Sequence, residues 1–292
     1  DLRKQVLWHG HSDKLHIDLV VNGEDVLMDG GRYTYVSGPK RFSYKDPSGH
    51  NTITVDDLPF TVCKDSWECS KLSQPVKENF RCTKLAEFAQ AGQLGYMDLP
   101  SGVYVNRKVV YIKPDLYVLA DEMYTGDRHT YQQYFHFNNH GTVTQKKFPC
   151  VAYRGKMAEA DFYFVSAQVK AELKSGHIAR HYNVEEENTV CKVTKQGEGF
   201  TSLITVIDAQ PGRPLSIEKL PVRSALKQTD YPETMAEALK ITAGEKEYVV
   251  ILCHQEVNSP TDLVEVDGCM GYGNVIVFDK AGDVLVGDVL NW

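Results

Sequence analysis

Short runs of alternating apolar and polar residues recur along most of the chain, and each has the length of a β-strand. Because successive side chains of a strand point to opposite faces, such alternation is typical of strands with one buried face. The clearest runs are His16–Val21, Thr52–Val55, Val103–Ile112, Leu116–Asp121, Tyr131–Phe137, Thr201–Ile207, Tyr248–Cys253, Val275–Phe278 and Val284–Leu290. The pattern predicts an all-β protein.

Turn sequences separate several of these runs. Lys113-Pro114-Asp115 lies between two of them and predicts a tight hairpin, and Asn22-Gly23 is a typical two-residue hairpin turn. There is no internal repeat. We therefore expect a large antiparallel β-sandwich over residues 1–210 and a smaller C-terminal β portion over residues 211–292.

One stretch has the pattern of a helix. Pro232–Ile241 reads PETMAEALKI, with Thr229 or Asp230 placed to begin a helix and Gly244 placed to end it. It lies in the polar stretch Gln210–Glu247, which we expect to connect the main sheet to the smaller C-terminal one. The sequence predicts a helix here.

Composition narrows the classes of function. Of the 292 residues, 42% are hydrophobic and 24% are charged, and no apolar run approaches the roughly 18 residues that suggest a membrane helix. A net charge of −7 argues against nucleic-acid binding by counterion release. The cysteines are odd in number and form no CxxC pair, so we expect reduced, mostly buried thiols rather than a disulfide framework or a thiolate zinc site. They are Cys63, Cys69, Cys82, Cys150, Cys191, Cys253 and Cys269.

Histidines near the start of the chain have the chemistry of a metal site. His9 and His11 flank Gly10, and residues i and i+2 of an extended chain face the same side, so both can point into one cavity. Two histidines and a carboxylate suit Zn²⁺ and leave a fourth position for water or substrate. Taken alone this HxH pair is a weak signal. A cupin-type iron site also opens with HxH, but it has a glutamate after three or four intervening residues, where this chain has Leu15 and His16.

The longer string around this pair resembles the start of the β-sheet region of heparinase II/III-type polysaccharide lyases, a family that includes oligo-alginate lyases. The segments that carry the resemblance are HGHSDKLHIDL (9–19), NGEDVLMDGGRYTY (22–35) and SGHNTITVD (48–56). It continues in RKV (107–109), KPDLYVLADE (113–122), the histidines around FHF (135–137) and GYGNV (271–275). The resemblance thus covers the chain in patches, and its first fifty residues are the specific part.

The resemblance implies a β-elimination reaction at a uronic acid and assigns roles to four residues. His9 corresponds to a catalytic histidine, and the residues that correspond to zinc ligands are His11, Asp29 and His50. It implies an acidic polysaccharide or oligosaccharide as substrate. We expect the metal to fix the loops of the site and so to orient His9, because elimination needs no metal-activated hydroxide.

Some family members also use a tyrosine between the aspartate and the last histidine. Tyr33 is our choice, with Tyr35 and Tyr44 as alternatives. Arg32 and Arg41 belong to a basic island in an acidic chain; they can pair with uronate or sulfate groups, or the island can be a solvated loop.

Family enzymes carry an N-terminal α/α toroid that supplies further catalytic groups, and these 292 residues contain no helical repeat of that kind. We expect this chain to be the C-terminal portion of a longer lyase, inactive without the toroid. The alternatives are a non-catalytic carbohydrate-binding or structural β-sandwich module that keeps a structural zinc, and a cupin-like iron oxidase. The family resemblance implies a periplasmic or secreted protein, the unpaired cysteines favour the cytoplasm, and a homodimer is left open.

A second group of histidines, His129, His136 and His140, is expected to be structural. In the FHF strand, Phe135 and Phe137 are predicted to share a buried face, with His136 on the other.

Overall fold

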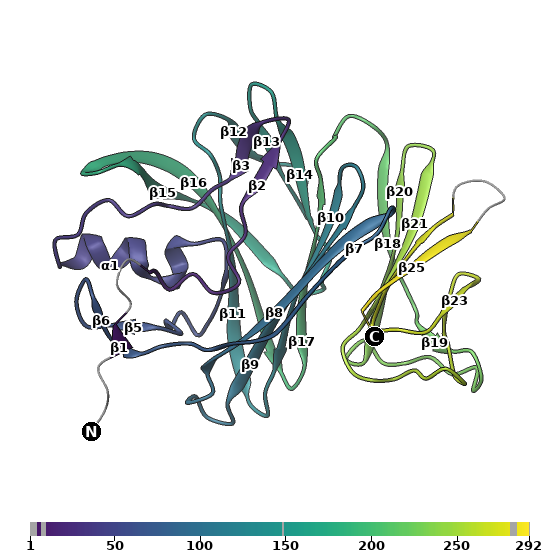
Figure 1. The fold of residues 1–292 in the computed structure, drawn as a ribbon. Helices are drawn as coiled ribbons and strands as arrows, with labels where there is room; N and C mark the ends of the chain where they lie inside the picture. The colour runs from purple at the N-terminus through teal and green to yellow at the C-terminus, as the bar shows by residue number, and fades with distance from the viewer. Residues whose placement is uncertain (1–4, 7–9, 148, 281–284, 292) are drawn as a thin grey trace. The chain divides into compact units, whose positions relative to one another are not determined.

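The computed structural model describes residues 5–6, 10–147, 149–280 and 285–291. Within these residues the chain is nearly all β, with antiparallel sheets, one short helix, α1 (Pro39–Lys45), and a single 3-10 turn, η1 (Pro47–Gly49) (Figure 1). The predicted all-β antiparallel class is confirmed. In the described part of the chain, no helix is long and apolar enough to cross a membrane.

The chain divides into two compact units. The first contains residues 1–78, 90–108 and 119–209, and the second contains residues 79–89, 109–118 and 210–292. The domain boundary proposed at residue 210 stays a prediction.

The largest sheet has eight strands in the order β12-β13-β14-β17-β10-β9-β8-β7. Their bounds are β12 (Thr142–Gln145), β13 (Cys150–Arg154), β14 (Glu159–Phe164), β17 (Thr201–Asp208), β10 (Leu116–Tyr124), β9 (Val103–Ile112), β8 (Ala86–Tyr96) and β7 (Pro75–Cys82). A four-stranded sheet has the order β15-β16-β11-β4. Its strands are β15 (Lys170–His181), β16 (Val184–Glu198), β11 (Arg128–His136) and β4 (Ile53–Val55).

In the first unit, the parts of these two sheets that belong to it face each other and form a sandwich. Phe135, on β11, packs against Phe162, on β14, with ring centroids 5.5 Å apart, and Phe137 packs against the same ring at 5.1 Å. All three rings are buried, and each burial stabilises the fold by about 1.5–3 kcal/mol. His136 lies on the opposite face, with Nε2 2.9 Å from the carbonyl oxygen of Ser48. The alternation predicted for this strand is confirmed.

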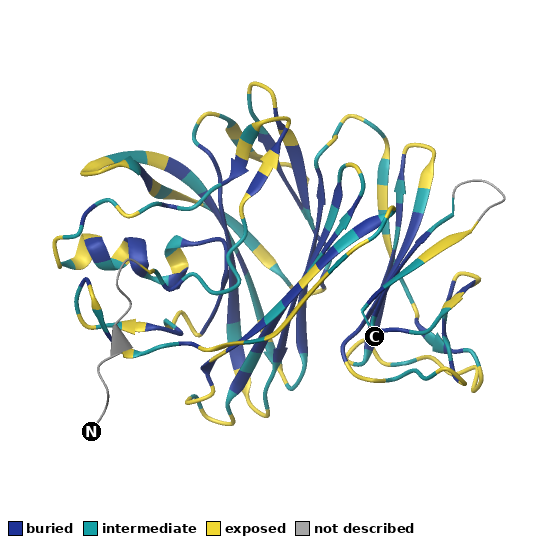
Figure 2. Cartoon of the chain, in the orientation of Figure 1, coloured by how far each residue is buried: buried dark blue, intermediate teal, exposed yellow. Residues whose placement is uncertain are grey.

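β15 and β16 form a long hairpin that the apolar pattern did not reveal. Most residues of β15 are exposed or half-buried, and Figure 2 shows the same along much of the hairpin. Helix α1 lies against β16, because Lys40 and Tyr44 both contact the carboxylate of Glu185. The hairpin therefore reaches the part of the first unit that contains the first fifty residues.

Two small sheets complete the first unit. One has the order β1-β6-β5, and the other pairs β2 with β3. Their bounds are β1 (Gln5–Val6), β5 (Val62–Cys63), β6 (Glu68–Lys71), β2 (Leu19–Val21) and β3 (Glu24–Leu27). Asn22 and Gly23 both have positive φ, as a type I′ turn requires, so the turn predicted between β2 and β3 is confirmed.

The second unit contains a five-stranded sheet, β18-β20-β21-β24-β25, and a three-stranded sheet, β19-β22-β23, with a shared apolar core. Their bounds are β18 (Leu215–Leu220), β20 (Ala236–Ala243), β21 (Lys246–Cys253), β24 (Val275–Asp279), β25 (Val286–Asn291), β19 (Arg223–Ser224), β22 (Val264–Val266) and β23 (Cys269–Gly271).

The helix predicted over Pro232–Ile241 is wrong. Most of that stretch is strand β20, which pairs with β18 on one side and β21 on the other. The first four residues of β20 are all buried, because a central strand has a neighbouring strand on each side and both of its faces are covered. Tertiary pairing thus overrides the helix-forming tendency of Ala, Glu, Leu and Lys.

Candidate metal centre

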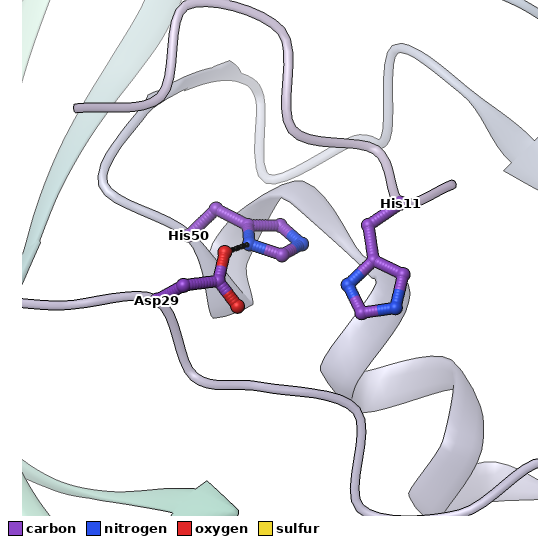
Figure 3. A group of neighbouring side chains, drawn as sticks. All are labelled: His11, Asp29 and His50. Atoms are coloured by element: carbon purple, nitrogen blue, oxygen red, sulfur yellow. Dashed lines mark hydrogen bonds and ion pairs between the residues drawn. The ribbon is translucent and has the colours of Figure 1, made fainter. Parts of the chain in front are cut away.

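Three side chains from three loops converge beside α1. His11 precedes β2, Asp29 follows β3 and His50 follows η1. One possible ligand atom from each lies within 4.8 Å of the others, as Figure 3 illustrates. The sequence-predicted trio is therefore brought together by the fold. His9, the predicted catalytic histidine, lies outside the described residues.

The carboxylate of Asp29 fixes the ring of His50. His50 Nδ1 donates a hydrogen bond of 2.7 Å to Asp29 Oδ2, and the amide of Gly31 donates one of 2.6 Å to Oδ1. This leaves the lone pair on His50 Nε2, a buried atom with no hydrogen-bond partner among the described residues. Nε2 points toward the ring of His11 (Figure 3).

These residues fit a divalent cation. A buried ring nitrogen without a partner is costly unless something accepts its lone pair. Two imidazoles and a carboxylate are also a common zinc donor set. His11, Asp29 and His50 are therefore suited to hold such an ion.

The electrostatic environment favours the neutral form of His11 and the ionised form of Asp29. Burial, together with the nearby His50 and Arg41, lowers the pKa of His11 to about 3. Burial acts to raise the pKa of Asp29, but the hydrogen bond from His50, the nearby His50 and His16 rings and the hydrogen bond from the Gly31 amide together hold the pKa below its usual range. At neutral pH one histidine is thus neutral and the aspartate is ionised, and such groups can offer lone pairs to a cation.

Arg41 lies on α1 next to His11. It is fully buried, and its Nη1 is 3.1 Å from His11 Nε2 and 3.3 Å from the carbonyl oxygen of Arg32. Its Nε and Nη2 have no hydrogen-bond partner among the described residues. The guanidinium groups of Arg32 and Arg41 lie 5.0 and 5.3 Å from the ring centroid of Tyr35, so two cations contact one aromatic ring. Unpaired donors of this kind suit an anionic group.

A cavity of about 390 Å³ opens beside the metal group, and Arg32 and Tyr35 help to line it. The sequence predictions missed the rest of its wall, Ala179–Tyr182, which comes from the end of β15 and the turn after it. Hydrogen bonds from Thr34 and the backbone lower the pKa of the Tyr182 phenol from its ordinary value. No local motif could have revealed these residues, because about 150 positions separate them from Asp29.

The three tyrosines considered for catalysis differ in their surroundings. Tyr35 lines the cavity with His11 and Asp29. Tyr33 stacks on Tyr44 with ring centroids 5.8 Å apart, and Tyr44 donates a hydrogen bond of 2.9 Å to Glu185. The choice of Tyr33 stays a prediction, and the geometry favours Tyr35 as the tyrosine beside the metal group.

A buried arginine ties two of the site loops to the sandwich core. Arg107, on β9, forms a two-point ion pair with Asp121, on β10, through contacts of 2.6 and 2.8 Å. Its Nη1 also donates to the carbonyl oxygens of Leu15, at 2.5 Å, and Asn51, at 2.7 Å. Asn51 directly follows His50, so the core fixes the backbone at the metal group.

Comparison with known proteins identifies the family of this chain. A family model described as "Heparinase II/III-like, C-terminal" matches residues 2–218. The chain belongs to this family. A search of curated proteins finds no match.

Several solved structures of the heparinase II/III-like type share the fold. The heparan sulfate lyase HepC from Pedobacter heparinus matches with a TM-score of 0.67 at 15% identity, covering 86% of this chain and 38% of HepC. One heparinase III structure matches with a TM-score of 0.67 at 13% identity, covering 84% of this chain and 37% of its own. A second matches with a TM-score of 0.63 at 15% identity, covering 83% of this chain and 36% of its own. At such identities the likeness shows the fold alone. The chain spans less than two fifths of the length of these lyases.

Proposed function

We propose that this chain is the metal-bearing β domain of a polysaccharide lyase that cleaves uronic-acid-containing glycans by β-elimination. The observation that carries the proposal is the convergence of His11, Asp29 and His50 in a member of the heparinase II/III-like family. The adjoining cavity supports it, because Arg32 lines the cavity and is suited to acidic sugars, and buried Arg41, which contacts His11, has unpaired donors among the described residues.

Zinc is the proposed ion, with His11, Asp29 and His50 as its ligands. When bound, it supplies a fixed positive charge and links three loops of separate origin. Asp29 Oδ2 lies 2.7 Å from His50 Nδ1, and His50 Nε2 is buried without a partner among the described residues, so these two side chains would hold the ion together with His11. His9 lies two residues before His11 in the chain, and we assign it to the reaction rather than to the metal.

The reaction removes the proton from C5 of the uronic acid, breaks the bond between C4 and O4, and protonates the leaving oxygen. The C5 proton is weakly acidic, so negative charge that develops on the carboxylate must be neutralised. Arg32 and Arg41 supply that charge in the proposal, and both contact the ring of Tyr35. His9 acts as an acid or base, because an imidazole exchanges protons readily near neutral pH. The remaining catalytic groups are assigned to the part of such a lyase that lies outside this chain.

The test uses an enzyme in which this chain is joined to a toroid-type domain. Heparin, heparan sulfate and alginate are offered separately, and the absorbance of the unsaturated uronate product is followed. His9→Ala is expected to lower kcat by about 100-fold or more, whereas His140→Ala, in a residue outside the proposed site, is expected to retain activity.

An unchanged rate for His9→Ala would remove that residue from the chemistry. A wild-type protein that binds acidic oligosaccharides without cleaving any of them would instead favour the alternative of a carbohydrate-binding module.

A further inference from the structure

Two of the cysteines face each other in the hairpin formed by β5 and β6. Cys63 ends β5, Cys69 is the second residue of β6, and the two residues pair directly across the antiparallel strands. Their Sγ atoms are 3.4 Å apart. Spacing did not reveal the pair, because the two residues lie six positions apart and form no CxxC motif.

The backbone here suits a cross-strand disulfide. The amide of Lys64 donates to the carbonyl oxygen of Glu68 at 2.8 Å, so on the side of the turn Cys63 and Cys69 have the position of a non-hydrogen-bonded pair. On the other side, a β-bulge shifts the register between Val62 and Cys63. The Cα atoms of a non-hydrogen-bonded pair are about 4.5 Å apart, which lies within the range of about 4.4–6.8 Å found for disulfides. Bringing the sulfurs from 3.4 Å to a bond of about 2.05 Å is therefore a matter of side-chain rotation.

We propose that Cys63 and Cys69 form an intramolecular disulfide by exchange with a small-molecule or protein disulfide. Cys63 is the first nucleophile, because its side chain is partly exposed and that of Cys69 is buried. The Cys63 thiolate attacks the donor disulfide, forms a mixed disulfide and expels one donor thiolate. Cys69 then loses its proton and attacks Sγ of Cys63, which expels the second donor thiolate. The protein loses two electrons and two protons, and the donor gains the two electrons.

Burial agrees with this order of attack. Together with the contact to Cys63, it raises the pKa of the Cys69 thiol to about 12. A thiol with a raised pKa is a poor first nucleophile. It is suited to the second step, because Sγ of Cys63 then carries a leaving thiolate and lies in contact with it.

The hairpin that the disulfide would lock supports the wall of the candidate metal centre. In its turn, Ser66 donates a hydrogen bond of 2.7 Å to the carbonyl oxygen of Tyr35 and accepts one of 2.9 Å from buried Lys45. Trp67 stacks on the ring of Tyr35 with centroids 5.6 Å apart. Tyr35 in turn contacts both arginines. A cross-link between β5 and β6 would therefore restrain the support beneath Tyr35. The cross-link itself does not depend on the proposed lyase activity.

The test exposes the purified chain to oxidised glutathione, blocks free thiols with iodoacetamide under denaturing conditions without reductant, and maps peptides by mass spectrometry. The expected result is two fewer alkylated thiols than in the reduced protein, and a peptide pair joined through Cys63 and Cys69. Cys63→Ser and Cys69→Ser lose this linkage, and Cys82→Ser, which removes an exposed cysteine elsewhere, keeps it. Oxidation is expected to raise the melting temperature of the wild type and of Cys82→Ser, but not that of Cys63→Ser.

Two results would overturn the inference. One is full alkylation of Cys63 and Cys69 after oxidation. The other is a stable glutathione adduct on Cys63 that Cys69 never displaces.

Discussion

Replacing Arg107 by leucine should destabilise the first unit by much more than the loss of a surface ion pair would. Arg107 and Asp121 are 3% and 0% exposed, so the change strands a buried carboxylate that, among the described residues, keeps only the hydrogen bond from Gln133. Removing one partner of a buried pair costs about 3–5 kcal/mol. The carbonyl oxygens of Leu15 and Asn51 also lose a donor, at about 1 kcal/mol or more each.

The expected loss is therefore about 5 kcal/mol or more, a large share of the roughly 5–15 kcal/mol that stabilises a typical protein. For a chain of this size it corresponds to a fall in Tm of about 10 °C or more. Differential scanning calorimetry measures the fall directly, and urea unfolding measures the free energy.

The chain offers a matched control. Lys192 and Asp57 form an ion pair with the same 2.6 Å contact, but their side chains are 17% and 60% exposed. Lys192→Leu should cost at most about 1 kcal/mol. If Arg107→Leu lost no more stability than Lys192→Leu, burial would not set the cost of breaking these ion pairs. A double variant, Arg107→Leu with Asp121→Leu, should recover part of the loss, because it removes the stranded charge.

Two further predictions concern the walls of the site. Gly31→Ala should destabilise the protein by about 1–3 kcal/mol more than Gly23→Ala in chemical unfolding. Both glycines have φ near +80°, but only at Gly31 would a Cβ lie 2.3 Å from the backbone oxygen of Ala179. Equal losses would show that the close contact relaxes freely. Arg41→Met should leave Tm unchanged or raise it, because it removes a buried cation with donors unpaired among the described residues. The same change should weaken the binding of an acidic oligosaccharide, measured by calorimetric titration, by about 10-fold or more. Unchanged affinity would remove Arg41 from substrate recognition.

The strands that could be predicted from sequence are those whose burial alternates or is continuous. Val103–Ile112 is predicted and observed with the same bounds because its apolar side chains fill the sandwich. The hairpin β15–β16 could not be found in this way, since its residues are largely polar and its pairing partners are set by the fold. Helix α1 was also missed, because its seven residues are too few for a helical period to show.

The metal trio could be predicted because its residues lie in short motifs that resemble a known family, and the fold does bring them together. The buried state of Arg41 and the contribution of Tyr182 could not, because both depend on segments far apart in sequence. The Cys63–Cys69 contact escaped for a related reason: it depends on the register of a hairpin, which the spacing of two cysteines does not specify.

Metal analysis of the purified chain tests the central claim most directly. Inductively coupled plasma mass spectrometry should find about one zinc ion per wild-type chain, as a site of three protein ligands predicts. His11→Ala and His50→Ala should lose that zinc, whereas His9→Ala should keep it, because His9 is assigned to the chemistry and not to the metal. A wild-type chain without bound metal, or zinc retained by both ligand variants, would contradict the account.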